Sequence, residues 1–158
     1  MTELTHLDGA GGARMVDVGG KAETLRSATA EGAIRMSAEA FRLVADGAVT
    51  KGDVLTVSQI AGTMAAKRTA ELIPMCHPLG LDHIAVRASL DDGLPGVRVQ
   101  ATVRTTGKTG VEMEALTAVS VALLTVYDMV KSADRQMEMT AIRLLEKTGG
   151  SRGDWHRS

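Results

Sequence analysis

The stretch from residue 107 to residue 131 constrains the fold of this chain more than any other. From Ala115 to Val126 every residue is apolar or carries a small hydroxyl group, on all sides of a helical wheel. That pattern is typical of a helix buried on most of its faces, because an amphipathic surface helix would keep a polar side. The sequence therefore predicts one central helix against which the other elements pack.

Charged residues gather at the two ends of this helix. At its start, Thr109 and Glu112 have the spacing of a capping box, and acidic residues suit a helix N-terminus. At its end, Asp128 lies against the negative end of the helix dipole, at a cost of roughly 0.3–1 kcal/mol. Lys131 follows on the same face and can pair with it. We therefore predict that Asp128 and Lys131 form an acid/base pair.

Composition limits the class of protein. A chain of 158 residues suits one domain with one core. Aromatic residues make up only 2% of the chain. This argues against a protein that binds single-stranded nucleic acid, because such proteins stack the bases on aromatic side chains. The net charge of −1 excludes attraction of a polyanion by the protein as a whole, so any anion site must be a local cluster.

The sequence also bears on location. The single cysteine, Cys76, excludes an internal disulfide and suits a reducing cytoplasm. The N-terminus lacks a basic start followed by an apolar run, and no stretch of about 18 apolar residues occurs. We therefore expect a cytoplasmic protein that neither carries a signal peptide nor spans a membrane.

Hydrophobic periodicity and turn residues divide the rest of the chain into strands and helices. A strand is expected at 21–36, helices at 37–47 and 53–73, and strands at 81–90, 97–103 and 139–147. An apolar stripe carries the second helix to its end: Val57, Ile60, Met64 and Leu72. Residues 1–20 are expected to be a mobile arm, 21–150 a single domain and 151–158 a polar tail.

This order of elements is the split βαβ arrangement. It predicts an α+β fold, a ferredoxin-like sandwich in which helices cover one face of an antiparallel sheet. If the other face keeps its apolar residues, it needs a partner chain, so we expect an oligomer.

A second unusual stretch is Leu72-Ile-Pro-Met-Cys-His-Pro-Leu79. Two prolines flank Met75, Cys76 and His77, and Pro78 holds the backbone of His77 extended. Such a histidine is either aimed at a ligand or part of a rigid turn, and the residues alone leave both open. A metal site here lacks further ligands at the usual spacing, and a nucleophilic Cys76 has no geometric support.

Two lysines are candidates for binding an anion. Lys51 lies in a turn beside Gly52 and could reach a phosphate. Lys67 has Glu71 at i+4, so a solvated surface pair competes with an anion-binding role. Gly107-Lys108-Thr109 imitates a phosphate loop, but Thr102 stands where that motif requires glycine. The turn could still meet an anion at the helix N-terminus.

Two acidic residues stand at the start of the central helix. Glu112 and Glu114 are two residues apart, so a regular helix would point them to different sides and an extended entry would align them. For Glu112, capping competes with a role in a site.

Three motifs in this order resemble the molybdenum cofactor biosynthesis protein C family, the cyclic pyranopterin monophosphate synthases. They are the stretch 72–79, Lys108-Thr-Gly-Val-Glu-Met-Glu-Ala-Leu-Thr-Ala118, and Tyr127-Asp-Met-x-Lys131. Met15-Val-Asp-Val18 and Glu146-Lys-Thr-Gly-Gly150 match as well, so the resemblance covers nearly the whole chain past the arm.

Two departures from the family pattern are visible. Val130 and Ser132 replace the usual Cys and Ala around the lysine of the third motif, and Ser151-Arg152 replaces the common Lys-Ser in the tail.

The resemblance implies a ferredoxin-like subunit in a homohexamer, a trimer of dimers with active sites at subunit interfaces. It implies the substrate 3′,8-cyclo-7,8-dihydro-GTP, made by a radical enzyme upstream, and the products cyclic pyranopterin monophosphate and pyrophosphate. Asp128 and Lys131 would be catalytic, and Lys51 and Lys67 would bind the triphosphate. Other residues would line the substrate pocket, with Glu112 as a further candidate: Met75, Cys76, His77, Met113 and Glu114.

The implied chemistry suits these residues. Opening and closing rings at heteroatoms needs acid/base groups tuned near neutrality, and burial beside a carboxylate can tune a lysine in this way. Expelling pyrophosphate needs fixed cations, for which His77 and Lys147 are further candidates.

No acidic cluster of metal-ligand type occurs in the sequence. We therefore expect no obligatory cofactor or protein-bound metal, although Mg²⁺ could arrive with the triphosphate. The competing class is a non-catalytic one of the same fold, a nucleotide-binding regulator or assembly subunit, which would leave Asp128, His77 and Lys131 unexplained.

Overall fold

The structure, a computed structural model, describes residues 6–158 and consists of one sheet with helices on one face. Its elements are β1 (Thr24–Arg35), α1 (Ala38–Ala45), α2 (Val54–Ala66), α3 (Thr69–Leu72), β2 (His83–Asp91), β3 (Gly96–Gly107), α4 (Glu112–Val130), β4 (Glu138–Thr148) and β5 (Trp155–His156). The strand order is β2-β3-β1-β4-β5, and every pair is antiparallel. The predicted α+β ferredoxin-like sandwich is confirmed.

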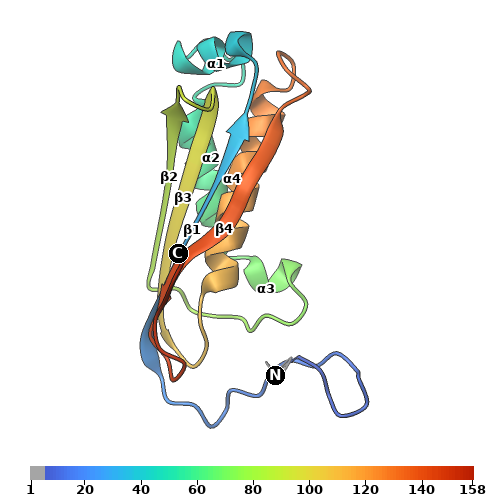
Figure 1. The fold of residues 1–158 in the computed structure, drawn as a ribbon, viewed down its shortest axis with the longest axis vertical. Helices are drawn as coiled ribbons and strands as arrows, with labels where there is room; N and C mark the ends of the chain where they lie inside the picture. The colour runs from blue at the N-terminus through green and yellow to red at the C-terminus, as the bar shows by residue number, and fades with distance from the viewer. Residues whose placement is uncertain (1–5) are drawn as a thin grey trace.

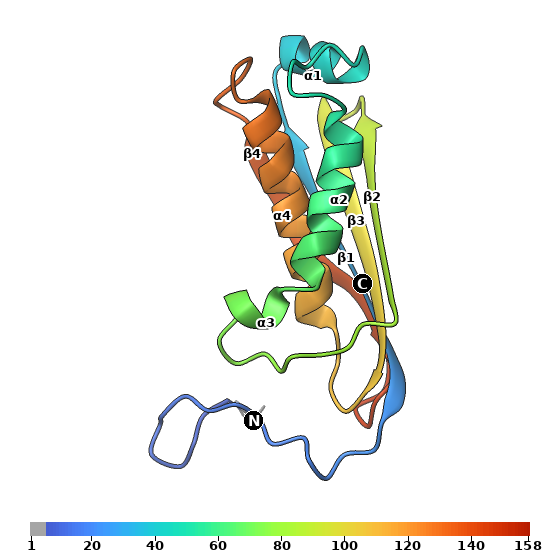
Figure 2. The same cartoon turned by 180° about the vertical axis from the view of Figure 1, so that it is seen from behind.

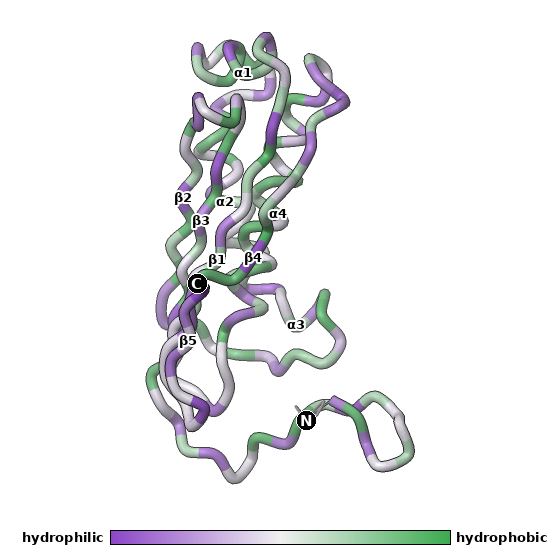
Figure 3. Tube along the Cα trace, in the orientation of Figure 1, coloured by the Kyte–Doolittle hydropathy of each residue, from purple (hydrophilic) through white to green (hydrophobic). Residues whose placement is uncertain are grey.

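The two long helices α2 and α4 lie side by side on the same face of the sheet (Figures 1 and 2). Strand β3 alternates as predicted, and polar and apolar residues alternate along its trace in Figure 3. Its apolar positions are fully buried beneath the helices: Val97, Val99, Ala101 and Val103. Helix α4 supplies the opposite wall, with Val119, Leu123 and Val126 also fully buried. The predicted central helix is therefore the core of the domain.

Helix α2 approaches α4 through small residues, which the sequence pattern did not reveal. Its buried positions are Val54, Ser58, Gly62, Ala65 and Ala66. A Cβ atom at Gly62 would lie 2.9 Å from the carbonyl oxygen of Ala118. Because the small residues face inward, the large apolar residues of α2 point outward.

The stripe on which the second helix was predicted therefore faces solvent in the single chain. Val57, Ile60 and Met64 are 39%, 55% and 51% exposed, and Leu72 is 58% exposed on α3. The helix also stops at Ala66 rather than near residue 73.

The face of the sheet opposite the helices is polar. Thr29 Oγ1 lies 3.0 Å from Thr102 Oγ1, and Arg143 binds Glu31 at 2.6 Å. This face therefore lacks the apolar surface that would require a partner chain to cover it. The exposed apolar surface belongs instead to the outer side of α2.

The ends of the chain differ from the prediction in one respect. Residues 1–5 of the predicted arm lie outside the described residues, and residues 6–20 are mostly exposed, with one isolated bridge between Leu7 and Ala13. The predicted polar tail contains the short strand β5, which pairs with β4.

Helix α4 has the length and mean hydropathy, 1.5, of a membrane span. The core helix of a water-soluble domain has the same properties, and α4 packs against α2 and the sheet.

Candidate active site

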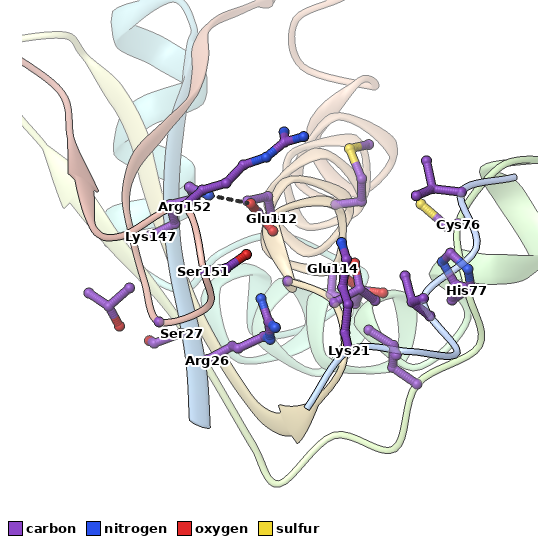
Figure 4. Close-up of a pocket in the computed structure, with 18 of the residues that line it drawn as sticks. Lys21, Arg26, Ser27, Cys76, His77, Glu112, Glu114, Lys147, Ser151 and Arg152 are labelled. Atoms are coloured by element: carbon purple, nitrogen blue, oxygen red, sulfur yellow. Dashed lines mark ion pairs between the residues drawn. The ribbon is translucent and has the colours of Figure 1, made fainter. Parts of the chain in front are cut away.

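A cavity of about 370 Å³ lies at the N-terminal end of α4. Four segments distant in sequence form its walls: the N-terminal stretch up to residue 27 at the start of β1, residues 75–79, residues 109–114 and residues 147–152. In the view of Figure 4, Cys76 and His77 lie on one side, Lys147 and Ser151 on the other, and Glu114 between them. Two of the motifs singled out in the sequence therefore meet at one place.

Basic side chains outnumber acidic ones in the lining of this cavity. They are Lys21, Arg26, Lys147 and Arg152, with His6 and His77 as two histidines. His77 and Lys147 were predicted from the sequence, whereas Lys21 and Arg26 were not, because they lie before or within β1 without a local motif. Only the fold brings β1 beside residues 147–152, through the register that pairs Ser27 with Thr148. The predicted local cluster of cations is present, but most of its members are not the predicted ones.

Both glutamates at the start of α4 line the cavity. The predicted capping box is absent: Val111 is the N-cap residue, and no side chain caps the helix. The Glu112 carboxylate lies against Gly110 instead, and its Oε1 is 3.6 Å from Lys147 Nζ. The two acids thus share the site although both belong to a regular helical turn.

Glu114 is the buried member of this pair, only 4% exposed. Burial raises the pKa of the Glu114 carboxyl above its ordinary value, and the negative charge of Glu112 adds to the rise. A carboxyl of this kind can hold a proton closer to neutral pH than a solvated glutamate does, so Glu114 is the strongest acid/base candidate in the cavity.

The stretch between the two prolines contributes Met75, Cys76 and His77 to the same wall, and Met113 joins them from α4. Burial raises the pKa of the Cys76 thiol, and the charges of Glu114 and Glu112 raise it further. A thiol that stays protonated is a poor nucleophile, so its surroundings disfavour a nucleophilic role for Cys76. Among residues 6–158, no cluster of three or more His, Cys, Asp or Glu side chains could hold a metal ion.

Asp128 and Lys131 form an ion pair, as their spacing indicated, and a third residue joins them. Lys131 Nζ lies 2.6 Å from Asp128 Oδ1, and Lys51 Nζ lies 2.8 Å from Asp128 Oδ2. A hydrogen bond from Lys131, and to a smaller extent one from Lys51, lowers the pKa of Asp128 to about 2. The side chains of Lys131 and Asp128 are 49% and 56% exposed, so the lysine is not buried within a single chain.

This triad of Lys51, Asp128 and Lys131 does not belong to the cavity. Glu114 and Asp128 are 14 positions apart on one helix, which corresponds to roughly 20 Å at the rise of an α-helix. Helix α2 ends near the start of α4 (Figure 2), and Lys67, its C-cap residue, is not among the residues that line the cavity. Because α2 ends before Lys67, the predicted helical pair with Glu71 does not form. The predicted site residues thus fall into two groups at opposite ends of α4.

Comparison with known proteins gives a consistent result. The model of the MoaC family matches residues 15–150. A protein from Roseiflexus sp. (strain RS-1) named cyclic pyranopterin monophosphate synthase is 60% identical over 155 residues, covering 98% of this chain and 98% of the relative. Proteins of the same name from Brucella ovis and Brucella abortus (strain 2308) are 57% identical over 153 residues, covering 97% of this chain and 93% of each relative.

Proposed function

The chain belongs to the MoaC family, and on that premise we propose that its cavity is the active site of a cyclic pyranopterin monophosphate synthase, a lyase of molybdenum cofactor biosynthesis. The proposed substrate is 3′,8-cyclo-7,8-dihydro-GTP, and the second product is pyrophosphate. The observation that carries the proposal is the lining of the cavity, where a buried acid/base group stands among several cations. Its volume of about 370 Å³ suits a small nucleotide-derived ligand.

The cations of the cavity suit the departure of pyrophosphate. Closing a cyclic phosphate forms a new P–O bond at the α-phosphorus and breaks the bond to the β-phosphate oxygen, which leaves with the pyrophosphate. Lys21, Arg26 and Lys147 supply fixed positive charge where that negative charge develops. These residues replace Lys51 and Lys67 as the first candidates for the triphosphate within one chain.

The glutamates suit the ring rearrangement. Glu114 can deliver a proton to a heteroatom or accept one from it, because its pKa is raised. Glu112 lies beside Lys147 and sets the charge around it.

The Lys51–Asp128–Lys131 triad requires a different placement. It lies roughly 20 Å along α4 from its own cavity, too far to touch the same small molecule. We propose that each active site combines the cavity of one subunit with the triad of another.

The outer side of α2 offers a surface for such a partner. Val57, Ile60 and Met64 form an exposed apolar stripe on this helix, and α2 itself lies alongside α4 (Figure 2). A two-fold axis through this stripe would set the helices of two copies antiparallel, so that the triad end of each approaches the cavity end of the other. A homohexamer built from three such dimers is the proposed assembly, and the cytoplasm is the proposed location.

We propose that no metal is held by the protein itself, and that any Mg²⁺ arrives with the triphosphate. Removing divalent cations with a chelator should then leave the protein folded and substrate binding only weakened.

Product analysis tests the activity. The purified protein is incubated with 3′,8-cyclo-7,8-dihydro-GTP, and mass spectrometry follows the pterin product while a coupled assay follows pyrophosphate. Formation of both in equal amounts is the expected result. Binding of the substrate without either product would contradict the proposed enzyme and favour a nucleotide-binding regulator.

A further inference from the structure

The last residues of the chain return to pair with β4. His156 is in register with Glu146, and Trp155 with Lys147. Beyond the strand, the backbone N–H of Arg157 donates to Leu145 at 2.7 Å. The chain end is therefore bonded to the segment that enters the cavity wall.

Two side chains, one at each end of the segment 154–157, add hydrogen bonds to this pairing. Arg157 Nε donates to the carbonyl oxygen of Leu144 at 2.8 Å, and its guanidinium lies 5.9 Å from the centre of the Trp155 ring. Asp154 Oδ1 accepts a hydrogen bond from the N–H of Gly149 at 2.9 Å. That bond closes the base of the loop formed by residues 149–153. We call residues 154–157 the latch.

The loop formed by residues 149–153 packs against β1 beside the cavity. Gly149 and Gly150 have φ values of +85° and +82°, a region that favours glycine. A side chain at Gly149 would collide with the carbonyl oxygen of Leu25, and one at Gly150 with the guanidinium of Arg26. The loop thus lies directly against β1 beside Arg26, one of the cations of the cavity.

The loop brings two side chains into the cavity lining, Ser151 and Arg152. Within residues 6–158, no carboxylate lies within ion-pair distance of the Arg152 guanidinium. Both residues are exposed. The two residues lie between glycines with positive φ, Gly150 on one side and Gly153 on the other.

We propose that the latch is a positioning device for the active site. Asp154 and Arg157 hold the 149–153 loop against β1, and the loop keeps Arg152 at the cavity as a further cation for the phosphates of the ligand. Asp154 and Arg157 touch no substrate in this arrangement. That the ligand is the cyclised GTP rests on the proposed function, whereas the mechanical role of the latch does not.

Three variants test the latch directly. Asp154→Ala removes the acceptor of the Gly149 N–H, Asp154→Asn keeps an oxygen acceptor in the same place, and Arg157→Ala removes the bond to Leu144. Asp92→Ala, which removes an exposed carboxylate in the β2–β3 turn at the other end of the sheet, is the matched control. Each protein is studied as the full chain by amide hydrogen exchange, by calorimetric titration with inorganic triphosphate, and by steady-state kinetics.

The expected result is a loss of ordering and of anion affinity together. Asp154→Ala and Arg157→Ala should speed exchange of the amides of residues 149–153. They should weaken triphosphate binding and raise KM by about five- to tenfold, the cost of ordering a released loop at each binding event. The kcat should change less than about twofold, because the ground state and the transition state lose the same contact. Asp154→Asn and Asp92→Ala should behave as the unmodified protein.

Two results would overturn the latch. Unchanged exchange in both alanine variants would show that residues 154–157 do not hold the loop. Faster exchange with unchanged triphosphate affinity would show that the loop does not serve the anion site. If the unmodified chain forms no product but the triphosphate affinities follow the expected order, the proposed reaction fails and the latch stands.

Discussion

Replacement of Gly62 by alanine tests the close contact between α2 and α4. The added Cβ would lie 2.9 Å from the carbonyl oxygen of Ala118, 3.1 Å from a Val86 methyl and 3.3 Å from the Ala122 methyl. The oxygen belongs to the backbone of the central helix, so the two helices must separate rather than a side chain turn away.

Two opposing free energies set the outcome. Alanine gains about 1 kcal/mol over glycine inside a helix. Overpacking a close contact costs typically about 1–3 kcal/mol, and this contact is at the severe end because one neighbour is backbone. We therefore expect Gly62→Ala to lower the free energy of unfolding by roughly 1–2 kcal/mol, which corresponds to a Tm lower by about 2–8 °C for a chain of this size.

Thermal melts of Gly62→Ala and of Gly93→Ala provide the comparison. Gly93 is a suitable control because a Cβ there would meet only the flexible Asp91 carboxylate, at 3.4 Å. The control should melt within about 2 °C of the unmodified protein. A Gly62→Ala protein more stable than the unmodified one would refute the close packing, and with it the reason why α2 turns its large apolar residues outward.

Three further predictions concern the site and the proposed subunit interface. Asp128→Asn and Lys131→Ala should each abolish pyrophosphate release, and the double variant should be little worse than either single variant. All three proteins should keep the oligomeric state and a near-normal Tm. Turnover that survives in either single variant would show that the ion pair is merely structural. Because the pKa of Glu114 is raised above 4.5, its contribution to stability is present at low pH and is lost as pH rises through the folded-state pKa. Glu114→Gln should therefore gain Tm relative to the unmodified protein as pH rises above about 4.5 while losing turnover, and a pH-independent difference in Tm would contradict the buried acid. Ile60→Asp, with Gln100→Asp on the polar sheet face as control, should dissociate the oligomer in light scattering, whereas an intact assembly would place the interface elsewhere.

The fold followed from features that are local in sequence. The helix at residues 112–130 was predictable because its apolar run has no polar side, and β3 because Val97, Val99, Ala101 and Val103 alternate with polar residues. The helix caps at Ser37 and Asp53 were also predictable, since each side chain bonds an N–H within its own first turn.

The orientation of α2 was not predictable from its pattern. An apolar stripe indicates a buried face, but here a line of small residues packs inside and the stripe faces outward. The signal that could have revealed this is Gly62 in the middle of a helix, where glycine is costly unless something approaches closely. For a subunit of an assembly, two faces of a helix can both be buried, and hydrophobicity alone cannot rank them.

The site was predictable only in part. Met75, Cys76, His77 and the two glutamates were found because they lie in dense local motifs. Lys21 and Arg26 were missed because only the pairing of β1 with β4 brings them to the cavity, and no spacing in sequence encodes that meeting. The sequence also placed Asp128 in the same predicted site as these residues. Within one chain the length of α4 separates Asp128 from them, and no sequence pattern showed that separation.

Subunit mixing tests the shared active site most directly. Glu114→Gln has a damaged cavity and Lys131→Ala a damaged triad, so each variant alone should make no pyrophosphate. After exchange of subunits in equal amounts, half of the two-chain units should be mixed, and each mixed unit should hold one intact site out of two. About one quarter of the unmodified activity should therefore return. If native mass spectrometry shows that subunits have exchanged and no activity returns, cavity and triad do not combine across an interface, and the proposed site is wrong.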